Sequence, residues 1–293
     1  MAGYIMMHEH ITIDLSGPKN NPDCYLDCFE QTVQEMKELK KRGVTTVLDV
    51  TNDGMGQDVE YVERVAKASG MKIIHSTGCY KEPFLPDYLE HEKTEQIAER
   101  MIRDIEVGLQ GTDKKAQVIG EIGTSKDIWT DLEKKLFEAA VIAHKKTGKM
   151  ITTHTSLGTL GHEQVEFFKQ REVDLSKVVI GHVDLSGDEA YIEKMLADGV
   201  NVEFDTIGKI NYQPDELRAD ILASLIRKGY SKQIVLSVDL TRKSHMKEFG
   251  GIGYSYLFDV FIPMLKERGV EEEDLKQMLI ENPRLLLGEE GIR

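Results

Sequence analysis

Six residues of the sequence carry side chains that bind divalent metal ions, and each of them lies at the end of a short apolar run. Two are histidines separated by one glutamate, and each of four later runs ends in one more histidine or carboxylate. The six residues are His8, His10, Glu121, His154, His182 and Asp239. Imidazole and carboxylate groups are typical ligands of zinc and similar cations. Two neighbouring cations lower the pKa of a water between them and polarise an ester, so the set predicts metal-dependent hydrolysis.

The number of these residues favours two metal ions over one, because a single tetrahedral zinc would leave some of them unused. Burying Glu121 and Asp239 without countercharge would cost roughly several kcal/mol each, and two cations supply that countercharge. Asp239 is predicted to be both a ligand and the group that accepts the proton of the attacking water. A lone histidine at a strand end is more often structural, so the prediction depends on the coincidence of all six.

The segments that carry these residues predict an α/β fold with a parallel sheet. Eight short apolar runs alternate with segments of helical spacing, among them 27–43, 58–70, 131–148 and 189–199. The runs are 4–10, 44–51, 72–78, 116–123, 150–156, 177–184, 201–208 and 233–241. Eight strand–helix units without a linker predict a (β/α)8 TIM barrel, in one domain over residues 1–293. A doubly wound open sheet is the alternative, but its usual glycine-rich first turn is missing from the sequence.

In a barrel of this kind, the carboxyl ends of the strands carry the active site. Because side chains alternate along a strand, His8 and His10 share one face, which is the barrel interior if Met7 faces the helices. The same alternation directs Glu121 inward if Val118 faces outward. The sequence therefore predicts that the metal-binding side chains converge inside the barrel.

A basic segment after the last run, TRKSHMK (241–247), predicts an anionic small-molecule substrate, since an arginine fork suits phosphate or carboxylate. The candidates for substrate contact are Tyr80, Lys209, Arg242, Lys243, His245 and Tyr254. Tyr254 lies in the glycine-containing segment 250–256, which is predicted to be a loop over the mouth of the barrel. The alternative is an ordinary solvated surface segment whose charges pair with acidic neighbours.

Composition excludes several other classes of protein. The 293 residues carry a formal net charge of −14, which opposes binding to nucleic acid or to an anionic membrane surface. No apolar run approaches the roughly 18 residues of a membrane span, and the sequence does not open like an export signal. Three cysteines without the spacing of a metal ribbon or a disulfide framework suit a reducing compartment. We therefore expect a cytoplasmic protein.

The sequence resembles the phosphotriesterase family of the amidohydrolase superfamily over essentially its whole length. The motifs that carry the resemblance are MMHEHITIDLSG (6–17), EIGTS (121–125), GHVD (181–184), DTIGK (205–209), VDLT (238–241) and ENPRLLL (281–287). The resemblance implies two divalent ions: a first held by His8, His10 and Asp239, and a second held by His154 and His182. Zinc is the first expectation, with manganese, cobalt or nickel as the alternatives.

One position departs from the better-known members of the family. Many of them bridge the two ions with a carbamylated lysine, whereas this sequence has Glu121 at that point. Both groups present two oxygens to two cations, so the resemblance still implies a hydrolytic binuclear centre.

Some members of the family hydrolyse lactones of phosphorylated sugars, which would explain both the metal ligands and the basic segment. A phosphoesterase or carboxylesterase with weak phosphotriesterase activity is the alternative enzyme, and a metal-binding barrel without turnover is the alternative from another class. Likeness to the family also makes a homodimer an option.

Overall fold

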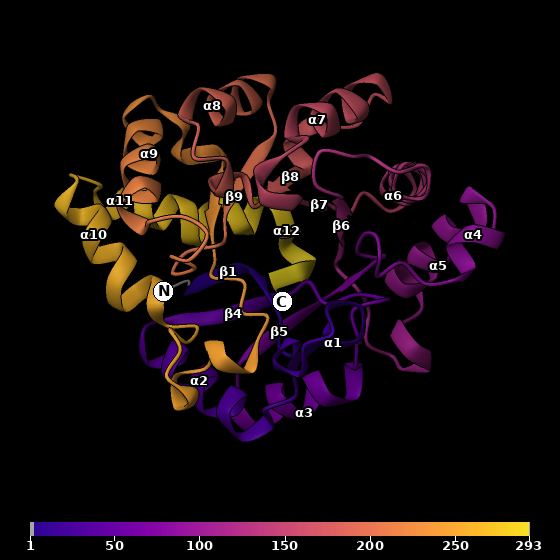
Figure 1. Ribbon diagram of the computed structural model, residues 1–293, viewed down its shortest axis with the longest axis horizontal. Coiled ribbons are helices and arrows are strands. Elements are labelled where there is room, and N and C mark those ends of the chain that lie inside the picture. Colours follow the sequence, from indigo (N-terminus) through magenta and orange to yellow (C-terminus); the bar gives the residue numbers. More distant parts are fainter. Residues whose placement is uncertain (1–2, 293) are drawn as a thin grey trace.

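Eight parallel strands form the (β/α)8 barrel that the sequence predicts, and helices surround it (Figure 1). The computed structural model describes residues 3–292. In their order around the barrel, the strands are β1 (Tyr4–Glu9), β4 (Val44–Asp49), β5 (Lys72–Thr77), β6 (Val118–Thr124), β7 (Ile151–Thr155), β8 (Val178–Gly181), β9 (Asn201–Phe204) and β10 (Ile234–Leu236). The barrel strands are arranged in the order in which they occur in the chain, which is the order of a barrel and not of a doubly wound sheet. Between β1 and β4, the short strands β2 (Ile13–Asp14) and β3 (Tyr25–Leu26) form a separate two-stranded sheet.

Side-chain hydrogen bonds join β1, the first strand in this order, to the two residues that directly follow β10, the last strand. The His8 N–H donates to Ser237 Oγ at 2.8 Å, and the Val238 N–H donates to Glu9 Oε1 at 2.9 Å. All four residues are buried. The barrel is therefore closed beside the first candidate metal ligand.

The helices begin and end close to where the helical spacing predicts. The longer ones are α2 (Phe29–Lys41), α3 (Val59–Ser69), α5 (Thr94–Glu106), α6 (Asp131–Thr147), α7 (Gly161–Gln170), α8 (Glu189–Asp198), α9 (Asp215–Arg227) and α12 (Asn282–Ile292). The shorter ones are α1 (Ser16–Lys19), α4 (Tyr88–His91), α10 (Ile262–Glu267) and α11 (Glu272–Lys276). Gly70, Gly148 and Gly199 follow α3, α6 and α8 with positive φ, a conformation that ends a helix and that glycine adopts without strain. Within residues 3–292, no helix combines the length and apolar composition that crossing a bilayer requires.

Apolar side chains fill one end of the barrel interior. Seven of the eight strands, or the residue just before them, contribute, and α12 adds two leucines. The members are Ile5, Met7, Leu48, Val50, Ile74, Val118, Met150, Val179, Val235, Leu286 and Leu287. α12 is drawn in yellow near the centre of Figure 1. This apolar plug leaves the carboxyl ends of the strands as the polar end of the interior.

His8 points into the barrel as predicted, but the simple alternation of side chains along β1 from which this direction was predicted is wrong. Met7 was expected to face the helices, but it packs in the interior cluster together with Ile5. The register of β1 against β4 shifts between Met6 and Glu9. An additional residue in a strand reverses the alternation of its side chains. The side chains of Met7 and His8, which are adjacent in the chain, therefore both point inward.

β6 departs from simple alternation in the same way. Val118 was expected to face outward, but it packs in the interior cluster. The register of β6 against β7 shifts between Ile119 and Ile122, both of which belong to the outer core. Glu121 lies within this irregular stretch and turns its carboxylate inward. The inward directions of His8 and Glu121 thus depend on irregularities of β1 and β6 that the sequence pattern does not predict.

Candidate active site

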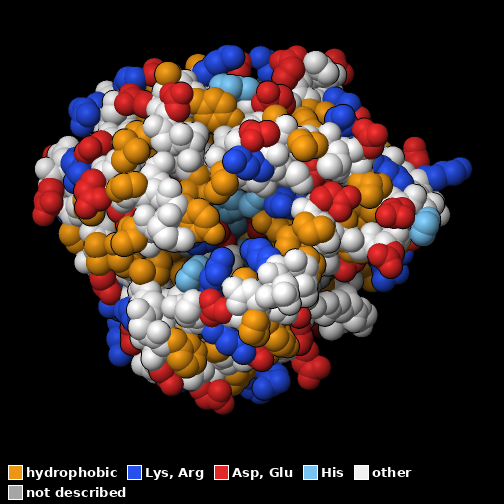
Figure 2. All heavy atoms as spheres, in the orientation of Figure 1, with side chains coloured by type: hydrophobic (Ala, Val, Ile, Leu, Met, Phe, Trp, Pro, Cys, Tyr) orange, Lys and Arg blue, Asp and Glu red, His pale blue; other side chains and the backbone are white. Residues whose placement is uncertain are grey.

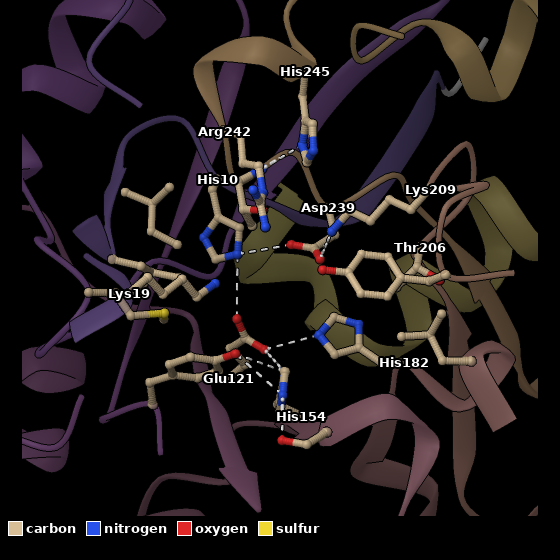
Figure 3. Close-up of a pocket in the computed structure, with 18 of the residues that line it drawn as sticks. His10, Lys19, Glu121, His154, His182, Thr206, Lys209, Asp239, Arg242 and His245 are labelled. Atoms are coloured by element: carbon tan, nitrogen blue, oxygen red, sulfur yellow. Dashed lines mark hydrogen bonds and ion pairs between the residues drawn. The ribbon is translucent and has the colours of Figure 1, made fainter. Parts of the chain in front are cut away.

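The six predicted metal ligands converge around Glu121 at the carboxyl ends of the strands. Figure 3 draws all of them except His8. Oε2 of Glu121 lies 3.2 Å from His154 Nδ1, 3.5 Å from His8 Nε2 and 3.6 Å from His182 Nε2. Its other oxygen, Oε1, lies 3.4 Å from His10 Nε2. One carboxylate therefore faces four imidazoles, which suits a group that bridges two cations.

Asp239 completes the cluster from the end of β10. Its Oδ1 lies 3.2 Å from His10 Nε2 and 4.0 Å from His8 Nε2. Asp239 itself has a positive φ of 51°, which sets it apart from the extended strand that precedes it. The ligand atoms of His8, His10 and Asp239 all lie within 4.8 Å of one another, and so do those of His8, Glu121 and His182.

Orphaned polar atoms indicate that this cluster fits metal ions. His8 Nε2, Glu121 Oε2 and Asp239 Oδ1 are buried and make no hydrogen bond. Buried polar atoms are normally paired, and an unpaired one is costly. These three atoms point toward one another and are all of the type that binds zinc or a similar cation. Divalent cations among them would satisfy all three.

Carboxylates behind the histidines orient His8 and His182. His182 Nδ1 lies 2.7 Å from Asp205 Oδ1, and His8 Nδ1 lies 3.2 Å from Glu203 Oε2 and 3.3 Å from Asp205 Oδ2. A carboxylate accepts from the Nδ1–H of each ring and fixes its orientation, with Nε2 directed at Glu121. His182 adopts a positive φ of 58° directly after β8, so its direction also departs from strand alternation.

His10 is oriented by a neutral partner. The Thr51 hydroxyl donates to the Thr12 carbonyl oxygen at 2.8 Å, so Thr51 Oγ1 accepts from His10 Nδ1–H, also at 2.8 Å. The Tyr254 hydroxyl donates to the His10 carbonyl oxygen at 2.6 Å. Both interactions hold His10 with Nε2 directed at Glu121 and Asp239.

Replacement of Asp205 by asparagine is expected to weaken metal binding about 10- to 100-fold, because the neutral amide polarises His8 and His182 less than a carboxylate does. Competition with a chromogenic chelator measures this affinity. Glu63→Gln is the matched control, since Glu63 accepts from His75 at 2.9 Å outside the barrel. Equal metal affinity in the wild type and the Asp205 variant would contradict the positioning role.

The electrostatics of the cluster favour added positive charge. Burial alone would raise the pKa of Glu121 and of Asp239, but the histidines around Glu121 and the Lys209 ammonium beside Asp239 hold both pKa values well below their usual range. Burial also lowers the pKa of His154 to about 3, and the adjacent His182 adds to this effect. His154 is therefore a neutral imidazole, the form that binds a metal ion.

A cavity of 470 Å³ opens above the cluster. Figure 2 shows a recess near the centre of this face, with histidine side chains inside it and Lys or Arg side chains beside it. Its apolar walls include Ile13, Leu15, Met55, Phe84, Leu157 and Leu185. The lysines and arginines that line it are Lys19, Lys81, Lys209 and Arg242. The cavity can hold a small molecule that carries negative charge.

Four of the six predicted substrate contacts line this cavity, namely Tyr80, Lys209, Arg242 and His245. The Tyr80 hydroxyl lies 3.3 Å from each ring nitrogen of His154. Lys209 is buried, with its Nζ in contact with Asp239 Oδ2. Burial lowers the pKa of His245 to about 4, so its ring is neutral at pH 7.

The structure does not bring the other two, Lys243 and Tyr254, to the cavity. Lys243 Nζ pairs with Asp27 Oδ1 at 2.6 Å, which turns the side chain away from the site. Tyr254 is fully buried, and its N–H donates to Glu35 Oε2 at 2.8 Å. The segment 250–256 thus packs against α2 and supports His10 from behind, where a loop over the mouth was predicted.

Several residues of the site were not predicted from the sequence. Lys81 directly follows Tyr80, and Lys19 ends the short helix α1 after the first strand. Asp205 belongs to the DTIGK motif, and Glu203 is the charged residue of the strand NVEF (201–204). A buried charge in the middle of a strand was the available signal for Glu203, because such a group needs a partner.

Comparisons with known proteins agree with this geometry. The model of the phosphotriesterase family matches residues 1–287. The phosphotriesterase homology protein of Escherichia coli is 44% identical over 282 residues, which cover 96% of this chain and 97% of that protein. A crystal structure of the Escherichia coli protein, complexed with phosphate in its active site, has a TM-score of 0.96 at 43% identity and covers 98% of this chain and 99% of its own.

Two further relatives have names that state an activity. An aryldialkylphosphatase of Saccharolobus solfataricus is 32% identical, over 96% of this chain and 94% of that protein. A phospho-furanose lactonase of Mycoplasmopsis synoviae is 30% identical, over 96% of this chain and 86% of that protein. Both activities are hydrolyses of ester bonds.

Proposed function

Because this chain belongs to the phosphotriesterase family, and is therefore a metal-dependent hydrolase of ester bonds, we propose that its substrate is a lactone of a phosphorylated sugar. One observation carries the proposal: four cationic side chains, Lys19, Lys81, Lys209 and Arg242, line the cavity of a chain whose net charge is −14. Such a cavity attracts an anionic substrate. The likeness to a phospho-furanose lactonase and to a protein that binds phosphate in its active site supports the same class.

The six converging residues are proposed to hold two divalent cations. His8, His10 and Asp239 would hold the first, and His154 and His182 the second, with the Glu121 carboxylate between them. Cations in such a site lower the pKa of water and stabilise negative charge on the oxygen of the scissile group. Zinc is the first expectation, and manganese, cobalt or nickel would suit the same ligands.

Side chains of this protein would transfer the proton, bind the substrate and exclude water. Asp239, kept ionised by Lys209, would accept a proton from the attacking water and return it to the ring oxygen that leaves. The Tyr80 hydroxyl, which faces the cavity beside His154, would donate a hydrogen bond to the substrate. The apolar walls would exclude water from the reacting bond.

A second candidate is a phosphoesterase or carboxylesterase with weak phosphotriesterase activity. The aryldialkylphosphatase relative supports it, because that name describes a reaction on an acyclic phosphate ester. The two candidates differ in the preferred shape of the substrate. A lactonase prefers a cyclic ester, and the alternative prefers an open one.

Proton release from a panel of esters, followed with a pH indicator, tests the proposal. The panel pairs each sugar lactone with its phosphorylated form and adds an aryl carboxylate ester and an aryl phosphotriester. Zinc-loaded protein is expected to hydrolyse phosphorylated lactones with a kcat/KM at least about tenfold above that of the unphosphorylated ones. Faster turnover of the acyclic esters would favour the second candidate. No turnover of any ester would contradict both and favour a metal-binding barrel without catalysis.

A further inference from the structure

Two of the lysines that line the cavity lack a carboxylate partner. Among residues 3–292, neither Lys19 nor Lys81 forms an ion pair within 4.0 Å, and the Lys81 ammonium donates only to the Glu82 carbonyl oxygen, at 2.8 Å. The two other cations of the cavity are partnered. Lys209 Nζ contacts Asp239, and Arg242 lies 4.0 Å from Asp23. The positive charges of Lys19 and Lys81 are therefore available to bind a ligand.

One aromatic ring holds the two lysines on the same wall of the cavity. Lys19 Nζ lies 5.9 Å, and Lys81 Nζ 5.8 Å, from the centroid of Phe84, which also lines the cavity. Lys81 Nζ lies 5.4 Å from the ring centroid of Tyr80 as well. Figure 3 shows the Lys19 side chain among the residues that line the cavity, with its ammonium group directed into it. Aromatic faces attract ammonium groups without neutralising them, so they position both charges and leave both available.

Burial and neighbouring cations of the cavity destabilise the charge of both ammonium groups. Partial burial in the cavity wall lowers the pKa of each lysine. The charges of Arg242 and Lys209 lower the pKa of Lys19 further. The charge of Lys19 in turn lowers the pKa of Lys81. A ligand with two negative charges would relieve both effects. A phosphate monoester carries a charge of about −1.5 to −2 at pH 7, whereas a carboxylate carries only one negative charge.

We propose that Lys19 and Lys81, arranged around Phe84, form the subsite that binds the phosphate monoester of the substrate. The inference rests on the proposed function, because it assigns the anionic group of that substrate to one wall of the same cavity. It moves the recognition of phosphate away from the basic segment after β10, where Arg242 is shared with Asp23 and Lys243 pairs with Asp27. The ester of the bound molecule then extends from this wall toward Glu121 and Asp239.

Calorimetric binding of three probes to the zinc-loaded full chain tests the subsite without requiring catalysis. Ribose 5-phosphate carries the phosphate monoester, ribonate carries only a carboxylate, and ribose carries no charge. Lys19→Met and Lys81→Met remove the charge and keep an unbranched side chain. Each variant is expected to weaken binding of ribose 5-phosphate about 10- to 100-fold, as loss of one charged hydrogen bond does. Binding of ribonate should change less than about twofold by comparison.

Lys115→Met is the matched control, because Lys115 is exposed before the start of β6, at the opposite end of the barrel. It changes the net charge equally and should leave all three affinities unchanged. The proposal is overturned if the wild type does not bind ribose 5-phosphate, if both cavity variants bind it as tightly as the wild type, or if they weaken ribonate binding equally.

Kinetics on the lactone panel separate this inference from the proposed function. If lactones are hydrolysed, the two variants should raise KM for the phosphorylated lactone about 10- to 100-fold and leave kcat nearly unchanged. Equal effects on phosphorylated and unphosphorylated lactones would contradict the phosphate subsite but not the lactonase activity. If the wild type hydrolyses no lactone and the two variants selectively lose binding of ribose 5-phosphate, the lactonase activity is contradicted and the phosphate subsite is supported.

Discussion

Asp239→Asn is expected to lower kcat by about two to four orders of magnitude, the usual contribution of a general acid or base. The amide keeps the size of the side chain but can neither accept a proton at neutral pH nor balance the charge of Lys209, which contacts Asp239 Oδ2. Steady-state kinetics on the best ester of the panel measures the loss. Far-UV circular dichroism and the thermal midpoint should show a folded barrel.

Metal content distinguishes the two roles assigned to Asp239. A variant that keeps its ions but loses turnover has lost the proton acceptor, whereas a variant that loses an ion has lost a ligand. Asp259→Asn is the control, because Asp259 also pairs with a cation, Arg42, at 2.6 Å on the outside of the barrel. A kcat within about twofold of the wild type for Asp239→Asn would contradict both roles.

The barrel could be predicted from the sequence because its evidence is local and repeated. Eight β-branched runs and the glycines that end helices, such as Gly70 and Gly148, each report their own segment. Parallel strands in a barrel then bring the ends of all runs to the same face. For the same reason, the convergence of ligands that are far apart in the sequence could be predicted without any contact being known.

The directions of individual side chains could not be predicted in the same way. The prediction for His8 assumed an unbroken period of two, but a register shift in β1 puts both Met7 and His8 inside. A second shift in β6 does the same for Val118 and Glu121. Strand irregularities concentrate at functional sites, where they redirect a side chain. Simple alternation therefore fails at the residues that matter most for chemistry.

Substrate contacts were harder to predict than metal ligands because charge in a sequence does not reveal its partner. Arg242 and Lys243 are adjacent, yet Arg242 lines the cavity and Lys243 pairs with Asp27 outside it. Lys19 is the last residue of the short helix α1, and no pattern in the sequence distinguishes it from a surface lysine. Only the folded chain brings it beside Lys81, over the ring of Phe84.

Glu121→Gln is expected to have a comparably large effect, through the metal ions themselves. Oε2 of Glu121 is buried without a hydrogen bond and faces His8, and a glutamine there loses the charge and turns an N–H₂ donor toward cations or imidazoles. Loss of an outer partner weakens metal binding about 10- to 100-fold, so loss of the carboxylate between two ions should exceed about 100-fold. Plasma mass spectrometry after dialysis should find about two ions per chain in the wild type and one or fewer in the variant, with turnover lost in parallel. Glu203→Gln is the control: the Glu203 carboxylate pairs with Nδ1 of His8, the ring nitrogen that faces away from Glu121, so this variant should keep both ions with reduced affinity. If Glu121→Gln retained both ions and full turnover, the carboxylate could not be the bridge, and its contacts with four histidines would be structural.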